Sequence, residues 1–173
     1  QTINHLIKSE LALKNKNLDF EVENTKNNME NKLRVAVLFG GRSNEKEISL
    51  ESGRNILYKL SPQKYNAMPI FVDSNLDLYK IDQKLLVRNS TGEITLGLTQ
   101  DMKIKWSDLK NICDFVFIAL HGGEGENGSV QGALEMLGMP YNGSSVLASA
   151  LCMDKFKTNN FLRSKGFDVP AGL

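Results

Sequence analysis

Two continuous apolar runs, each followed directly by glycine, constrain the fold more than any other feature of the sequence. Val35–Phe39 leads into Gly40-Gly41, and Phe115–Leu120 leads into His121-Gly122-Gly123. Apolar runs of this length are typical of strands buried on both faces of a sheet that helices cover. Helical patterns lie between and after the two runs, so we predict an α/β fold: an open, mostly parallel sheet with flanking helices.

Length and composition limit the classes of function. At roughly 150 residues per domain, a chain of 173 residues holds one complete domain and a piece of another. Hydrophobic residues make up 41% and charged residues 24%, as in a globular domain. The net charge of +1 provides no field for nucleic acid or an anionic membrane surface. Neither apolar run is long enough to span a bilayer.

Periodicity and turn residues predict the other elements. In the first half of the chain these are a helix over Ser43–Leu60 and a strand over Asn66–Val72, in which Pro69 indicates an edge or irregular segment. Short hairpins follow around Asn75 and Thr91-Gly92, with strand-like alternation in Glu93–Leu98. The second half is predicted to contain a strand over Asp114–Leu120, a helix over Val130–Leu137, a short strand over Met139–Tyr141, and one or two helices over Ser144–Lys165 that end at Gly166.

The first 32 residues differ from the rest of the chain. They contain seven asparagines and neither glycine nor proline. Leu6, Leu11 and Leu13 suggest a short amphipathic helix, and alternation in Leu18–Val22 suggests a strand. We interpret 1–32 as an extension, a linker or the tail of an upstream fused domain. No residue of the segment, His5 included, has a context that suggests chemistry.

The two cysteines favour a reducing, cytoplasmic location. Cys113 and Cys152 lack metal-ligand spacing, and both have apolar neighbours, so we predict buried free thiols. A basic region followed by an apolar one, as in a secretory signal, is not found after Gln1.

Candidate functional residues follow the two predicted buried strands. In an open parallel sheet, ligands bind at the carboxyl ends of the strands. Seven of the 14 glycines fall in the range 122–143, a density that lets the backbone approach a ligand closely. The same glycines also suit a set of tight turns without a ligand. The first strand exit has no GxGxxG pattern, which disfavours a simple Rossmann dinucleotide site.

Three side chains near these exits have both a functional and a structural interpretation. Glu45 either holds a substrate ammonium group or complements the dipole of the helix that it begins. His121 either pairs with a substrate carboxylate, or donates a hydrogen bond as a neutral imidazole, or is structural. Lys155 has no Walker A pattern around it, and most helix lysines are simply solvated.

Taken together, these segments resemble the amino-terminal part of D-alanine–D-alanine ligases of the ATP-grasp superfamily. The resemblance runs from about Leu33 to the chain end and rests on four motifs in the family's order and spacing. They are Gly40-Gly41-Arg42-Ser43-Asn44-Glu45-Lys46-Glu47-Ile48-Ser49, His121-Gly122 with Gly125-Glu126-Asn127-Gly128, Gln131-Gly132 with Pro140-Tyr141-Asn142-Gly143, and Ser149-Ala150 with Met153-Asp154-Lys155.

The resemblance implies a role for each motif residue. Glu45 is expected to bind the amino group of the first D-alanine, as a catalytic and substrate-binding residue. His121 is expected beside that substrate's carboxylate, and Lys155 at the phosphates of ATP. Glu126 is expected to orient the glycine-rich loop. Asn127 departs from the family, which usually has aspartate there, so the conformation of this loop is open.

The resemblance also implies a reaction. ATP phosphorylates one D-alanine, and the amine of a second attacks the acyl phosphate, as in peptidoglycan precursor synthesis and cell wall biogenesis. Residues 33–143 then form the amino-terminal (pre-ATP-grasp) ligase domain, and 144–173 begin a truncated ATP-grasp domain. Magnesium ligands are expected further along, so we predict no metal ligand here and no ligation by this chain alone. The expected partners are D-alanine, ATP and a second copy in a homodimer.

Two alternatives are open on these residues. A D-alanine–D-lactate or D-alanine–D-serine ligase would share the first subsite. A non-catalytic binding or regulatory module would retain the small α/β domain without the reaction.

Overall fold

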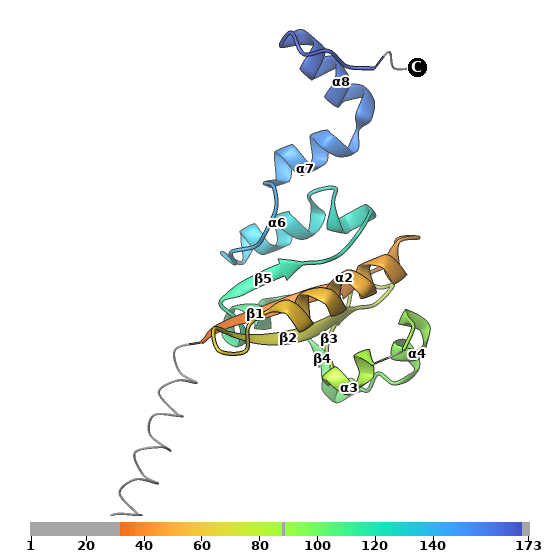
Figure 1. Ribbon diagram of the computed structural model, residues 1–173, viewed down its shortest axis with the longest axis vertical. Coiled ribbons are helices and arrows are strands. Elements are labelled where there is room, and N and C mark those ends of the chain that lie inside the picture. The colour runs from red at the N-terminus through yellow and green to blue at the C-terminus, as the bar shows by residue number, and fades with distance from the viewer. Residues whose placement is uncertain (1–31, 88, 171–173) are drawn as a thin grey trace, which may run out of the picture. The chain divides into compact units, whose positions relative to one another are not determined.

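The computed structural model describes residues 32–87 and 89–170 and contains a five-stranded sheet in the order β4-β3-β2-β1-β5 (Figure 1). The predictions for residues 1–31, His5 among them, lie outside the described residues. The strands are β1 (Leu33–Gly40), β2 (Tyr65–Val72), β3 (Leu78–Lys80), β4 (Lys103–Ile104) and β5 (Phe115–Ile118).

The centre of the sheet is parallel and one side is antiparallel. Strand β1 pairs in parallel with β2 and with β5, so Val37 lies between Pro69 and Phe117. Strands β3 and β4 continue the sheet beyond β2 with antiparallel pairs. The predicted open α/β sheet is confirmed, and the carboxyl ends of β1 and β5 meet at one edge.

Helices cover both faces of this sheet. The α-helices are α2 (Lys46–Lys59), α3 (Gln83–Leu86), α4 (Thr91–Leu96), α5 (Leu109–Ile112), α6 (Ser129–Met136), α7 (Val146–Met153) and α8 (Lys155–Ser164), and the short 3₁₀ turns are η1 (Gln100–Met102), η2 (Trp106–Asp108) and η3 (Gly123–Gly125). No helix among the described residues is long and apolar enough to cross a membrane.

Strand β1 separates two hydrophobic clusters. Ala36 and Leu38 lie in the cluster that includes Leu134 of α6, whereas Val35, Val37 and Phe39 lie in the cluster that includes Leu50 of α2. Because successive strand residues point to opposite faces, burial on both faces requires an apolar residue at nearly every position. This explains why the buried part of β1, Val35–Phe39, is a continuous apolar run.

Two predictions for the region between β2 and β5 are wrong. Pro69 does not mark an edge, because β2 lies between β1 and β3. Its missing N–H faces the β3 side, where the carbonyl of Pro69 accepts from Ile81 at the end of that ladder. The hairpin and strand predicted around Thr91-Gly92 are instead helix α4, since Ser90 and Glu93 form a capping box at its start.

Two other predicted elements are present, one of them only in part. The hairpin around Asn75 joins β2 to β3, and the Asp73 carboxylate accepts from the backbone N–H of Asn75 and of Asp77 at 2.8 and 2.9 Å. The short strand over Met139–Tyr141 is reduced to a single parallel bridge between Tyr141 and Val116.

The two cysteines are both free, but only one is buried. Cys113 is buried, and burial raises the pKa of its thiol. Cys152 is exposed on α7, so the prediction of a second buried thiol is wrong. Its neighbour Met153 is exposed as well, so apolar neighbours in the sequence did not indicate burial here.

Candidate functional site

The site begins at the turn that links β1 to α2. Gly40 has a φ of 97°, and a Cβ atom there would lie 2.6 Å from the carbonyl oxygen of Val72. Only glycine fits this conformation, and the turn brings Glu45 to the N-cap of α2. The Glu45 side chain makes no capping hydrogen bond and is therefore available to face a ligand.

Two serines join this turn to the end of β5. The Oγ atom of Ser49 is fully buried, accepts from the Gly40 N–H at 2.9 Å and donates to the Ala119 carbonyl at 2.9 Å. Ser43 Oγ donates to the His121 carbonyl at 2.6 Å. These bonds hold the exits of β1 and β5 together.

Glu45, His121 and Glu126 converge at this junction. A carboxylate oxygen of each glutamate and a ring nitrogen of His121 all lie within 4.8 Å of one another. Nδ1 of His121 is 3.8 Å from Glu126 Oε1, and their side chains are 36% and 45% exposed. Gly122 has a φ of 66°, and a Cβ atom there would lie 3.2 Å from Ser43 Oγ and in ordinary contact, at 3.5 Å, with Glu45 Oε2, so this glycine lies directly beside the cluster. Two carboxylates and an imidazole thus share one solvent-accessible space.

Side-chain amides fix the shape of the second exit. Asn142 pairs with both backbone groups of Ile118, with its Oδ1 accepting at 2.6 Å and its Nδ2 donating at 3.2 Å, as a neighbouring strand would. Asn127 Oδ1 accepts from the Ser129 N–H at 3.0 Å at the start of α6. Aspartate would offer the same acceptor, so the departure at Asn127 preserves this bond.

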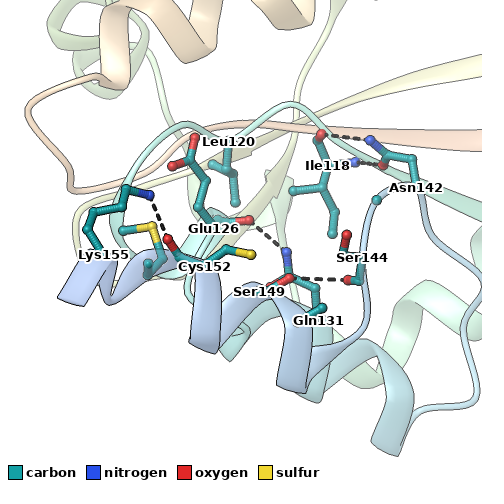
Figure 2. A pocket seen from close by; sticks show the side chains of 13 residues that line it. Ile118, Leu120, Glu126, Gln131, Asn142, Ser144, Ser149, Cys152 and Lys155 are labelled. Carbon is teal, nitrogen blue, oxygen red and sulfur yellow. Dashed lines mark hydrogen bonds between the residues drawn. The ribbon is translucent and has the colours of Figure 1, made fainter. Parts of the chain in front are cut away.

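Lys155 does not join the three-residue cluster. Its Nζ donates to the Cys152 carbonyl at 2.6 Å and reaches a neighbouring pocket of about 360 Å³. Figure 2 shows Lys155 and Glu126 at the same end of this pocket, so Glu126 borders both the pocket and the cluster. The other lining residues are Ile118, Leu120, Gly125, Gln131, Asn142, Gly143, Ser144, Ala148, Ser149, Cys152 and Met153.

Two neighbours of the cluster were missed by reasoning from the sequence. Ser52 of α2 lies with its Oγ 2.8 Å from Nε2 of His121. Arg42 forms an ion pair with Glu124, and this hydrogen bond lowers the pKa of Glu124 and raises that of Arg42. Ser49 and Ser52 are three residues apart and so share a helix face, which was the available signal for the serine.

The cluster is a poor match for magnesium. Its atoms are close enough to surround an ion, but Mg²⁺ prefers six oxygen ligands in octahedral geometry, and one donor here is an imidazole nitrogen. Exposed acidic groups alone do not make a metal site, so we assign no metal to these residues.

The chain is similar to known proteins in both sequence and structure. The family model described as "D-ala D-ala ligase N-terminus" matches residues 34–144. A D-alanine–D-alanine ligase of Coxiella burnetii is 38% identical over 156 residues, covering 82% of this chain and 42% of that protein. A D-alanine–D-alanine ligase of Bacillus anthracis is 35% identical over 138 residues, covering 80% of this chain and 36% of that protein.

Solved structures agree with the sequence matches. The D-alanine–D-alanine ligase from Coxiella burnetii superposes with a TM-score of 0.69 at 35% identity, covering 82% of this chain and 43% of the other. The VanG D-Ala:D-Ser ligase from Enterococcus faecalis gives a TM-score of 0.68 at 28% identity, covering 81% and 44%. The chain therefore spans less than half of the length of these relatives.

Proposed function

The chain belongs to the family of D-alanine–D-alanine ligase amino-terminal domains, and from this premise we propose that it is the substrate-side part of an ATP-dependent ligase that joins two D-alanines. The reaction passes through an acyl phosphate and serves peptidoglycan precursor synthesis. Because the chain matches only the first part of its relatives, we propose that ligation requires the remaining ligase segments as well.

One observation carries the proposal: Glu45, His121 and Glu126 converge where β1 and β5 end. Two exposed carboxylates at this distance repel each other, so a cation between them is favoured. The ammonium group of an amino acid is such a cation, and we assign it to Glu45. An N–H of His121 is then available to the carboxylate of the same molecule.

Holding an amino acid by both charged ends also explains a preference for one enantiomer. With the ammonium and the carboxylate held, the methyl group of D-alanine and that of L-alanine point in different directions from the chiral carbon. Only one of these directions is accommodated at a site of fixed shape. The hydrogen bonds of Ser43 and Ser49 supply that fixed shape.

We further propose that Lys155 contacts phosphate groups of ATP. An ammonium group has three N–H donors, and the Cys152 carbonyl accepts one of them, which leaves two for phosphate oxygens. Its cationic charge would stabilise the phosphoryl group as negative charge develops. Because Glu126 borders the same pocket, this loop would connect the amino-acid and ATP sides.

The domain assignment belongs to the same proposal. Residues 33–143 would form the amino-terminal ligase domain, and 144–173, with α7 and α8, would begin the ATP-grasp domain. Magnesium would neutralise phosphoryl charge when bound, and we place its ligands in the segments that the relatives have beyond this match. We also expect the whole protein to be a cytoplasmic homodimer.

The similarity to VanG supports a second candidate, a D-Ala:D-Ser ligase. Both activities begin with the same first D-alanine, so the cluster described above suits either. Competition between D-alanine and D-serine as the second substrate separates them.

The experiment that tests the proposal compares Glu45→Gln with Glu51→Gln in the natural gene product that contains this chain. Glu51 is also exposed on α2, but it pairs with Arg54 rather than facing His121. We expect E45Q to lose at least tenfold in kcat/KM for D-alanine, about 1.4 kcal/mol of transition-state stabilisation. E51Q should match the wild type. Equal activity of E45Q and E51Q would overturn the assignment of Glu45.

A further inference from the structure

We propose that Ser52 is a positioning residue that, together with Glu126, holds His121 in one tautomer, with the ring proton on Nδ1. Ser52 Oγ lies 2.8 Å from Nε2 of His121, within hydrogen-bond distance. A neutral imidazole carries a single proton, and the group that binds one ring nitrogen determines which nitrogen has it. Two arrangements of the Ser52–His121 pair are possible, and the other side of the ring distinguishes them.

Glu126 occupies that other side. Its Oε1 atom is 3.8 Å from Nδ1 of His121. If Nε2 carried the proton and donated to Ser52, the lone pair of Nδ1 would face a carboxylate, and the two would repel. If Nδ1 carries the proton, a positive N–H dipole faces Glu126 and Nε2 accepts from the Ser52 hydroxyl. Both contacts are favourable only in the second arrangement.

The backbone geometry keeps Ser52 in place for this role. The His121 carbonyl accepts from Ser43 in the turn before α2, and its ring contacts Ser52 in α2, so both ends of the residue are tied to one stretch of chain. The residue after Ser52 is Gly53, where a Cβ atom would lie 2.7 Å from the Phe39 side chain. Helix α2 therefore packs closely on β1 next to Ser52, which limits movement of its hydroxyl.

The fixed tautomer has a consequence for substrate binding, and this step rests on the proposed function. Nε2 is occupied by Ser52, whereas Glu126 Oε1, at 3.8 Å, is beyond hydrogen-bond distance of Nδ1, so a proton on Nδ1 can still be donated to a ligand that reaches it beside Glu126. A proton there gives a hydrogen-bond donor for the carboxylate of the first D-alanine, whereas a lone pair would repel it. Ser52 would thus act on the substrate only through His121.

Nitrogen-15 NMR of the 173-residue chain tests the tautomer directly. Protonated and unprotonated ring nitrogens have well-separated shifts, and the chain contains only two histidines, so His5→Gln assigns the signals of His121. Spectra are recorded at the alkaline limit, where they no longer change with pH. In the wild type we expect a protonated Nδ1 and an unprotonated Nε2.

Variants then test the cause. We expect Ser52→Ala to move both shifts of His121 towards the averaged values of exchanging tautomers, and Ser52→Thr, which keeps the hydroxyl, to restore the wild-type values. Ser61→Ala is the matched control, because Ser61 lies just beyond the carboxyl end of α2 and contacts Gln63 instead. The backbone amide spectrum shows whether each variant is folded.

Either of two results would overturn the inference: a wild-type spectrum with the proton on Nε2, or S52A shifts equal to those of the wild type. The first result needs no variant, so misfolding of S52A cannot hide it. The proposed function is judged separately, by D-alanine-dependent turnover. If the protein is an active ligase but the His121 proton is on Nε2, only the proposed tautomer is refuted. If the proton is on Nδ1 but the protein has no ligase activity, only the proposed function is refuted.

Discussion

Replacement of Ser49 by alanine should destabilise the domain through two buried backbone groups. The Ser49 hydroxyl is the hydrogen-bond partner that joins Gly40 N–H to the Ala119 carbonyl, and Ser49 is fully buried. Loss of one hydroxyl oxygen opens less space than the roughly 30 Å³ that a water molecule occupies, so water cannot replace it. Both backbone groups would lose this partner.

The expected cost follows from these two groups. An unsatisfied buried donor or acceptor costs roughly 1–3 kcal/mol, so S49A, which leaves two such groups, should lose about 2–6 kcal/mol of unfolding free energy. That loss is a large part of the roughly 5–15 kcal/mol of a typical domain. With a urea m-value of about 2 kcal/mol/M, the midpoint should fall by roughly 1–3 M.

Urea unfolding followed by tryptophan fluorescence measures this change. The chain has a single tryptophan, Trp106, whose indole N–H donates to the Leu76 carbonyl, so its emission reports on the folded state. Ser61→Ala serves as control and should stay within about 0.5 kcal/mol of the wild type. An S49A midpoint equal to that of S61A, with an unchanged slope, would refute the reasoning.

Two further predictions concern packing and charge. Gly53→Ala should lower the unfolding free energy, measured in urea, by about 1–2 kcal/mol, because the new Cβ atom would lie 2.7 Å from the Phe39 side chain. Gly132→Ala is the control and should be neutral or stabilising, because its Cβ atom would lie 3.7 Å from its nearest neighbour. Equal effects of the two substitutions would contradict the steric account. Hydrogen bonds from Arg34 lower the pKa of Asp114, so this pair stabilises the fold above the unfolded pKa of about 4 and ceases to do so as the pH falls through the folded pKa. Urea midpoints of wild type and Asp114→Asn should therefore differ at pH 7 and converge in acid, and a difference that grows in acid would reverse the assigned sign.

Local patterns in the sequence predicted the elements whose burial is simple. Strand β1 is buried on both faces, and the continuous apolar run Val35–Phe39 indicates this burial in the sequence. Alternation in Glu93–Leu98 predicts a strand, but this segment forms most of helix α4. The Ser90–Glu93 capping pair, which is also present in the sequence, is the pattern that indicates the helix. Pro69 predicts an edge strand, but β2 lies inside the sheet. Whether a missing N–H interrupts a ladder depends on which strands lie beside the proline, and the local sequence does not contain that information.

The site shows the same division between local and long-range information. Glu45, His121 and Glu126 were selected by motif, and their convergence follows from parallel strands that end at one edge. Ser49 and Ser52 were not selected as site residues, because their shared helix face does not reveal partners about 70 residues away. Only the packing of α2 against the end of β5 gives these hydroxyls their partners.

Phosphate release from ATP and magnesium by the natural gene product that contains this chain tests the central claim most directly. The account predicts release that requires D-alanine and does not occur with L-alanine. A well-folded product that releases no phosphate in response to D-alanine would contradict it.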